Sequence, residues 1–173
     1  MSVSLYDLSV ANYLQGLDAV SGFLGKGYDF CTSDRMGPNE MIEFRLFADM
    51  LPFHSQIVFV VHHSLGAVEG LKNGVFTPPA LNEAFDYPGL QKLVADAASA
   101  LRRLDREEVN ALEGRDVIFQ VGERKIPFTA ENFILSFSLP NFYFHAATAY
   151  DILRTKGVPL GKRHYLGQLR IKH

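Results

Sequence analysis

The sequence predicts an all-α fold of four long helices, with a small β-hairpin inserted before the last helix. Apolar residues recur at helical spacing over four long segments, and strict alternation of apolar and polar residues is confined to one short segment. With 173 residues, of which 47% are hydrophobic and 21% charged, the chain is long enough for one packed core. We therefore expect a single domain over residues 1–173.

The first helix is expected over residues 4–35 and the second from Pro52 to Asn73. Proline suits the first turn of a helix, and Pro38 indicates a further, short helix between these two in the same way. Gly74 is typical of a helix C-terminus and should end the second helix. The expected buried face of the first helix comprises Tyr6, Val10, Tyr13, Leu17, Val20, Leu24 and Cys31.

A proline-rich segment, TPPALNEAFDYPG at residues 77–89, predicts a loop that leads into the third helix. Asp86 or Tyr87 should open this helix, which continues at helical spacing as far as Leu104. Alternation in DVIFQVGERKIPF then predicts two short strands joined by a turn at Gly122. One side of the first strand is expected to carry Val117, Phe119 and Val121.

The last helix is expected from about Ala130 to Lys156, with Thr129 as its N-terminal cap and Gly157 as its stop. Pro140 lies inside this helix and should kink it, because proline cannot donate the main-chain hydrogen bond. The carbonyl group four residues earlier is then left without its helical partner and can accept a hydrogen bond from the interior.

Polar side chains on the inward faces of the second and last helices define a candidate pocket. Helical spacing places Gln56 and His63 on one flank of the second helix, whereas His62 faces solvent on the other side. On the last helix Asn141 and His145 lie one turn apart on a largely apolar face. These groups could hold a ligand, a metal ion or an ordered water, and either histidine could equally be a core residue with local partners.

Composition argues against several classes of partner. The net charge of -2 and the absence of a dense basic run argue against nucleic acid. The longest strongly apolar run, IVFVV at residues 57–61, is too short to cross a bilayer, and the first residues read as a helix without a signal sequence. Because Cys31 is the only cysteine, no intrachain disulfide can form, and we expect a cytoplasmic protein.

Three segments together resemble a known family: SLYDLSVANYLQGL, LFADMLPFHSQ and LPNFYFHAATAYDILRTKGVPLGKRHYLG. They are similar to an uncharacterised bacterial and fungal family, a domain of unknown function within the DinB/YfiT-like superfamily of candidate metalloenzymes. The resemblance covers essentially the whole chain and implies a four-helix bundle with long first and last helices. The superfamily includes metal-dependent thiol S-transferases and a thiol-dependent isomerase, which bind a divalent ion through one histidine of the second helix and two of the last.

Carried over to this sequence, the resemblance implies His63 and His145 as ligands of a divalent metal such as zinc or nickel. The third ligand position falls on Ala149, four residues after His145. Alanine offers no donor atom, so the three-histidine set is incomplete in this chain.

Three functions remain open on these grounds. The leading hypothesis is a DinB-like bundle, expected to form a homodimer, whose interior pocket binds a small molecule. Its predicted ligand-binding residues are Gln56, His63, Asn141 and His145. The alternatives are a divalent-metal enzyme of the thiol S-transferase or isomerase kind with a degenerate site, and a structural or interaction protein in which both histidines are core residues.

Overall fold

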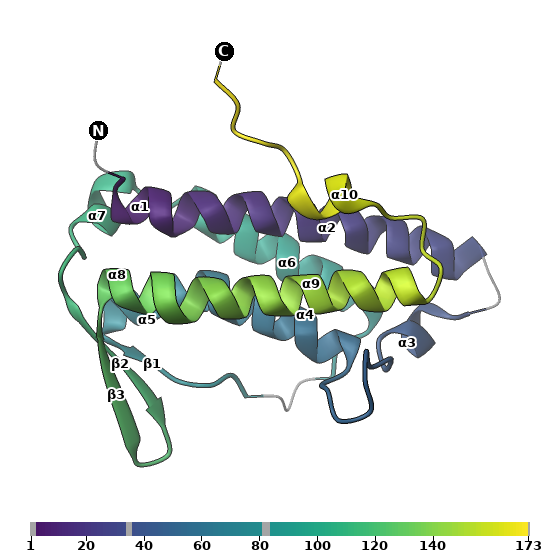
Figure 1. Ribbon diagram of the computed structural model, residues 1–173, viewed down its shortest axis with the longest axis horizontal. Coiled ribbons are helices and arrows are strands. Elements are labelled where there is room, and N and C mark those ends of the chain that lie inside the picture. The colour runs from purple at the N-terminus through teal and green to yellow at the C-terminus, as the bar shows by residue number, and fades with distance from the viewer. Residues whose placement is uncertain (1–2, 34–35, 81–83, 173) are drawn as a thin grey trace.

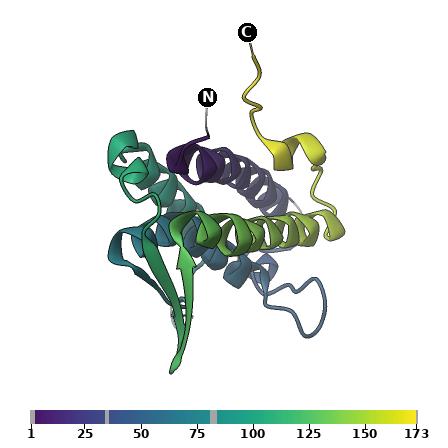
Figure 2. The ribbon, with the colours of Figure 1, turned by 60° about the vertical axis from the view of Figure 1, so that its left-hand side comes forward.

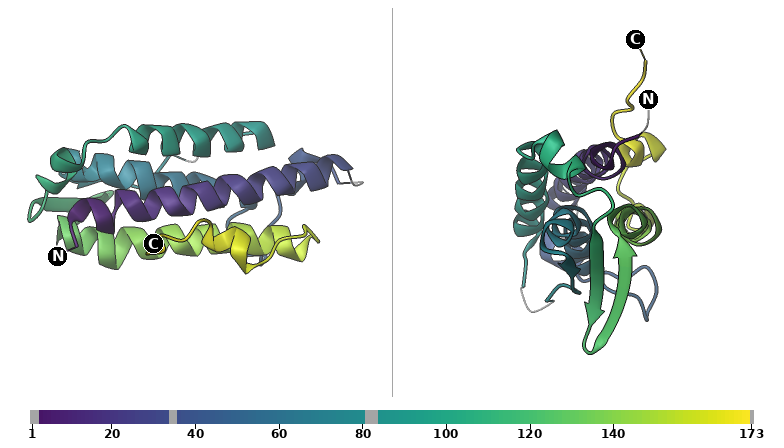
Figure 3. Two further views of the ribbon diagram at one scale, coloured as in Figure 1. Left: turned by 90° about the horizontal axis from the view of Figure 1, so that it is seen from above. Right: turned by 90° about the vertical axis from the view of Figure 1, so that its left-hand side faces the viewer.

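The computed structural model describes residues 3–33, 36–80 and 84–172 and is mostly helical, with a small three-stranded sheet (Figure 1). Four rods of helix run side by side in the described part of the chain, and the views from above and from one end agree on this arrangement (Figure 3). Large side chains fill the space between the rods, among them Tyr13, Phe23, Phe53, Tyr87, Phe133 and Phe142.

The first rod consists of α1 (Leu5–Leu8) and α2 (Val10–Ser33), which are interrupted only at Ser9. The apolar face expected for this helix is buried, apart from the half-buried Tyr6. Its expected end, at residues 34–35, lies outside the described residues. Gly16 allows α2 to approach the last rod closely, because a side chain at this position would collide with the ring of Phe142.

The second rod begins and ends where the sequence predicted. It comprises α4 (Phe53–Val61), the π-helical turn η1 (His62–Gly66) and α5 (Ala67–Asn73). Gly74 follows with a positive φ of 72°, which favours glycine, and ends the rod. The predicted short helix is also present, as α3 (Pro38–Met41). The π-helical turn was not predicted.

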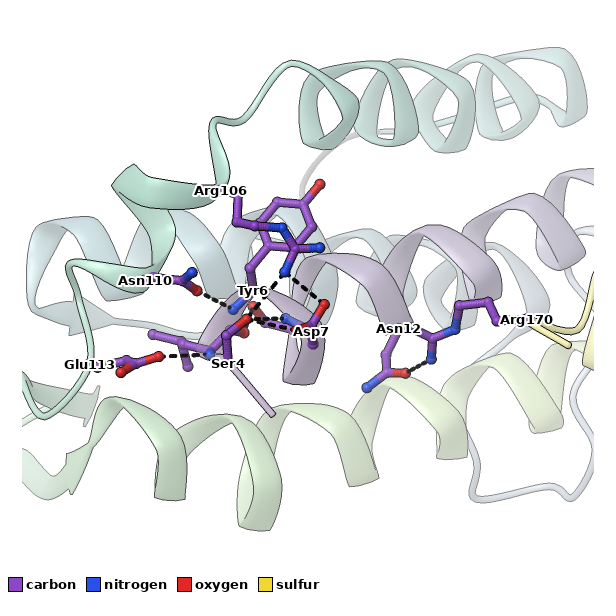
Figure 4. A network of polar contacts seen from close by, with 10 residues as sticks. Ser4, Tyr6, Asp7, Asn12, Arg106, Asn110, Glu113 and Arg170 are labelled. Carbon is purple, nitrogen blue, oxygen red and sulfur yellow. Dashed lines mark hydrogen bonds and ion pairs between the residues drawn. The ribbon is translucent and has the colours of Figure 1, made fainter. Parts of the chain in front are cut away.

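The third rod is α6 (Tyr87–Arg102), whose N-terminus is capped by the carboxylate of Asp86, as expected. The predicted loop at residues 77–89 includes residues 81–83, which lie outside the described part of the chain. A short helix, α7 (Arg106–Asn110), follows. Side chains from this helix and from the turn after it accept hydrogen bonds from the N-terminus of the first rod (Figure 4). The main-chain N–H of Leu5 donates to Glu113, and that of Tyr6 donates to Asn110.

Three strands form the sheet, in the order β1 (Val75–Phe76), β2 (Asp116–Val121) and β3 (Arg124–Thr129). Strands β2 and β3 are antiparallel and turn at Gly122, whereas β1, which was not predicted, pairs parallel to β2. The tip of β2 and β3 projects away from the helices (Figure 2). Val121 is consequently 46% exposed, although it alternates with the buried Val117.

The last rod follows β3 directly and is capped by Thr129, as expected. It comprises α8 (Ala130–Phe133), a second π-helical turn η2 (Ile134–Ser138) and α9 (Leu139–Thr155). Pro140 lies in the first turn of α9, just after the π-helical turn. The sequence predicted a kink at Pro140 and gave no sign of the local widening of the helix that precedes it.

The chain ends on the outer side of the first rod. Helix α10 (Lys162–Leu166) packs on α2, and the side-chain amide of Gln15 donates to the carbonyl oxygen of Leu166. None of the described helices combines the length and the apolar character needed to cross a membrane.

Candidate functional site

A buried chain of hydrogen bonds ties the two π-helical turns together. The Oγ of Ser138, in η2, donates to the main-chain carbonyl oxygen of His63, in η1, over 2.8 Å. Ser138 itself accepts from the hydroxyl of Tyr13 over 2.8 Å. A π-helical turn disrupts the regular helical pairing and is often found at functional sites. The two turns thus hold His63 in a fixed position between the second and last rods.

The imidazole of His63 lies in the wall of a pocket of about 250 Å³. Its side chain is 4% exposed, and its Nδ1 has no hydrogen-bond partner in the described part of the chain. Burying a polar atom without a partner costs about 1–3 kcal/mol, so such atoms are rare away from functional sites. The pocket is lined by Phe59, His62, His63, Phe76, Pro78, Pro79, Phe119, Phe137 and Asn141.

His62 also lines this pocket, so the expectation that it faces solvent was wrong. Its ring packs 4.4 Å from that of Phe76, centroid to centroid, and its buried Nε2 has no partner among the described residues. Two features account for the error. The π-helical turn that begins at His62 changes the angular step assumed for the helix, and the unpredicted strand β1 brings Phe76 against it.

On the opposite rod, the Nδ1 of His145 lies 2.7 Å from the Oε1 of Gln56. The amide of Gln56 has a fixed orientation, because its Nε2 donates to the carbonyl oxygen of Leu51 over 2.8 Å. Its Oε1 is therefore the acceptor, and His145 donates from Nδ1. This tautomer leaves a lone pair on the Nε2 of His145. Both Gln56 and His145 are buried.

The structure brings His63 and His145 together, as the sequence predicted. Their rings are almost parallel, with centroids 5.9 Å apart and an interplanar angle of 13°. The ring of Phe59 is stacked on both, 4.6 Å from His145 and 6.1 Å from His63. The two imidazoles and this phenylalanine therefore form one continuous aromatic layer between the second and last rods.

Burial keeps both imidazoles uncharged. Loss of hydration, together with smaller contributions from the neighbouring His62 and His145, lowers the pKa of His63 to about 3. Burial alone lowers the pKa of His145 to about 4. Burial also lowers the pKa of His62, although the main chain of Thr77 opposes this shift. At neutral pH the site thus contains neutral imidazoles with nitrogen lone pairs, and no imidazolium.

Asn141 lies at the edge of the pocket and is half-buried. Its Nδ2 donates to the carbonyl oxygen of Phe137 over 2.7 Å, within its own helix. This bond fixes the amide so that Oδ1 remains as a hydrogen-bond acceptor. Gln56 and His145, by contrast, are not among the described residues that line this pocket, and both ends of the Gln56 amide are already engaged.

The donor set for a metal is limited to imidazoles. Ala149 is fully buried and contributes only a methyl group at the third ligand position. Among the described residues, no group of three or more histidine, cysteine, aspartate or glutamate side chains is arranged to hold a metal ion. His63 and His145 could provide two nitrogen ligands, one fewer than an open zinc site usually has.

The aromatic walls of the pocket were missed by the sequence analysis. Phe76, Phe119 and Phe137 come from β1, β2 and η2 respectively, and their rings meet at centroid distances of 4.5–6.2 Å. Alternation marked Phe119 as inward-facing, but alternation does not say which helix a strand will cover. Only the tertiary arrangement of the sheet places these rings beside His63.

Comparison with known proteins supports the fold. The family described as "Domain of unknown function (DUF1993)" matches residues 5–166 of the chain. The crystal structure of a DinB family member protein from Shewanella denitrificans is similar to this structure, with a TM-score of 0.82 and 22% sequence identity. The similarity covers 98% of this chain and 95% of the other. No curated protein matches the sequence.

Proposed function

Because this chain belongs to the DUF1993 family of unknown molecular function, and its fold is that of a DinB family member, we propose a binding role for it. In this proposal the protein is a DinB-like four-helix bundle whose interior pocket binds a small uncharged molecule. The bundle consists of the rods α1–α2, α4–α5, α6 and α8–α9, and strands β2 and β3 form a hairpin before the last rod.

The pocket beside the ring of His63 carries this proposal. Its volume is about 250 Å³, whereas a single ordered water needs only roughly 15 Å³. The buried chain through Tyr13 and Ser138 holds the main chain of His63 in place. A largely apolar pocket with a few polar side chains in its wall is typical of a small-molecule site, where the polar groups orient the ligand.

A fragment screen by saturation-transfer NMR tests the proposal. Bound fragments should lose affinity in Phe119→Ala, which removes part of the pocket wall, and keep it in Phe47→Ala. Phe47 is the matched control, because it is 69% exposed and does not line this pocket. The proposal fails if no fragment binds the wild-type chain, or if every bound fragment binds the two variants equally well.

Divalent-metal catalysis of the thiol S-transferase or isomerase kind is the second candidate. Gln56 favours it, because a metal-binding histidine typically donates its other ring nitrogen to a fixed acceptor. The neutral state of both imidazoles also suits metal binding, which requires free lone pairs. In this candidate His63 and His145 would hold the ion, which would act as a Lewis acid on a substrate. Metal analysis of the wild-type chain and of His63→Ala and His145→Ala tests it.

A further inference from the structure

A second pocket lies between α2, α9 and α10, and we call it the α10 pocket. Its volume is about 250 Å³, and it shares none of its described lining residues with the His63 pocket. Val20, Phe142 and Ala146, which are all buried, line it together with Leu166 of α10. Apolar walls of this kind bind the hydrocarbon part of a ligand.

Aromatic side chains suit this pocket to a ring. Phe142, Tyr143 and Tyr165 all line it, and the rings of Phe142 and Tyr143 are 5.4 Å apart, centroid to centroid, at an interplanar angle of 72°. The hydroxyl of Tyr165 donates to the carbonyl oxygen of Tyr143 over 3.4 Å, which joins α10 to α9 at this pocket. Aromatic rings pack favourably in such edge-to-face arrangements, so a ligand ring would find partners here.

The guanidinium group of Arg170 lies at the edge of the α10 pocket. It donates from Nη2 to the Oδ1 of Asn12, a lining residue, over 2.5 Å (Figure 4). A neighbouring hollow, which Arg170 itself lines, shares Gln15 with the α10 pocket. Burial raises the pKa of the Tyr143 hydroxyl, and the charge of Arg170 opposes this rise, so the cation also interacts with a second lining residue.

The positive charge of Arg170 is not neutralised within the described part of the chain, where no carboxylate forms a salt bridge with it. Its partner Asn12 is uncharged, and Asp18 in the neighbouring hollow is paired with Arg102. After Asp151 the sequence contains no aspartate or glutamate, and its basic residues are Arg154, Lys156, Lys162, Arg163, Arg170 and Lys172. A planar guanidinium in such a basic segment is well matched to a carboxylate.

We propose that the α10 pocket binds a small aryl carboxylate, with the ring against Phe142 and Tyr143 and the carboxylate group at the guanidinium of Arg170. This site goes beyond the function proposed above, because it is a different pocket and takes a ligand of different charge.

Three probes with the same ring on a short chain test the ligand class by NMR titration of the full chain: phenylacetate, phenylacetamide and 2-phenylethylammonium. At low ionic strength phenylacetate should bind about fivefold more tightly than the uncharged amide, because it gains an exposed ion pair with Arg170. The ammonium ion should bind more weakly than the amide. The preference for phenylacetate should shrink at about 0.5 M salt, which screens exposed charges.

Two charge variants locate the group that recognises the carboxylate. Arg170→Gln removes the charge but keeps an amide donor, and should make the affinities for phenylacetate and phenylacetamide equal. Lys172→Gln is the matched control, because it removes a positive charge from the same segment at a residue that lines neither hollow. It should keep the preference. An equal effect of the two variants would overturn the specific role of Arg170.

Two variants of α9 locate the ring. Tyr143→Ala removes part of the aromatic wall and should lower the affinities for phenylacetate and phenylacetamide by the same factor, about fivefold. Phe144→Ala is the control, because Phe144 is the next residue of α9, is 55% exposed and does not line this pocket. It should change neither affinity.

The outcomes separate this site from the His63 pocket. Phenylacetate binding that is weakened by Phe119→Ala and not by Tyr143→Ala would place the ligand in the His63 pocket and overturn the proposal. No binding of phenylacetate to the wild-type chain, or equal affinities for phenylacetate and phenylacetamide, would also overturn it. The fragment screen with Phe119→Ala tests the His63 pocket independently, so either proposal can fail while the other stands.

Discussion

The Oε1 of Gln56 accepts a hydrogen bond from the Nδ1 of His145, and the same amide donates to the carbonyl oxygen of Leu51. This relationship fixes the tautomer of a buried histidine that belongs to the same aromatic layer as His63. The two histidines thus have opposite environments. His145 has a partner that determines its proton position, whereas the Nδ1 of His63 has none in the described part of the chain.

Gln56→Leu should destabilise the fold, because it leaves the Nδ1–H of His145 and the carbonyl oxygen of Leu51 without their partner. The free energy of unfolding is expected to fall by about 1–3 kcal/mol, measured by urea denaturation. Gln168→Leu is the control at an exposed position and should change stability by less than about 0.5 kcal/mol. Equal stability of Gln56→Leu and the wild type would contradict the buried hydrogen bond.

The low pKa values of His63 and His145 predict a loss of stability in acid. Unfolding returns each imidazole to an ordinary pKa near 6.5, so below that pH the unfolded chain binds protons that the folded chain does not. Stability is therefore complete above about pH 6.5 and decreases as the pH falls towards the folded-state values near 4 and 3. The expected slope is at most about 1.4 kcal/mol per pH unit for each histidine.

Urea unfolding at several values between about pH 7 and about pH 4.5 measures this slope. His63→Phe should flatten it, because the variant cannot bind the proton in either state. An unchanged slope in His63→Phe would show that His63 does not stay neutral in the folded chain.

Ser138→Ala should break the buried chain from Tyr13 to the carbonyl oxygen of His63. Burial raises the pKa of Tyr13, so its hydroxyl stays neutral and would lose its acceptor. We expect a loss of about 1–3 kcal/mol in unfolding free energy. Ser136→Ala, in the same π-helical turn, removes only an exposed hydrogen bond to Asn132 and should cost less than about 0.5 kcal/mol. Similar losses in both variants would contradict a special role for Ser138.

Gly16→Ala and Gly22→Ala should have opposite effects on stability, although both lie in α2. A methyl group at Gly16 collides with the ring of Phe142, and this overpacking should cost about 1–3 kcal/mol. A methyl group at Gly22 meets open space, so the better helix propensity of alanine should add up to about 1 kcal/mol. Thermal unfolding of the two variants tests the close packing of α2 against α9. Equal melting temperatures for Gly16→Ala and Gly22→Ala would contradict this packing.

The limits of the helical rods could be predicted because they depend on local chemistry. Asp86 and Thr129 cap N-termini through their side chains, and Gly74 and Gly157 end rods with positive φ angles of 72° and 94°. These residues specify the start or the end of a helix without help from distant parts of the chain. The strand pair around Gly122 depends on a similarly local signal.

The π-helical turns and the walls of the pocket could not be predicted because they depend on distant contacts. The turn at His62–Gly66 has no distinctive sequence signal. Within it, the carbonyl oxygen of His63 accepts a hydrogen bond from Ser138, which lies 75 residues away in the sequence. Strand β1 has two residues and exists through pairing with β2, so periodicity cannot detect it. The sequence therefore indicated that His63 and His145 face each other, but not that His62 and the phenylalanines complete the pocket.

The central claim is that the His63 pocket binds an uncharged small molecule without a metal ion. The most direct test uses chain purified without a histidine tag and a fragment that binds it in the NMR screen. The affinity for this fragment is measured before and after dialysis of the protein against a chelator, and the metal content is measured on the same samples. We predict the same affinity for the ligand in both samples and no change when zinc or nickel is added. A stoichiometric metal that is lost in both His63→Ala and His145→Ala, together with ligand binding that disappears after dialysis, would contradict the claim.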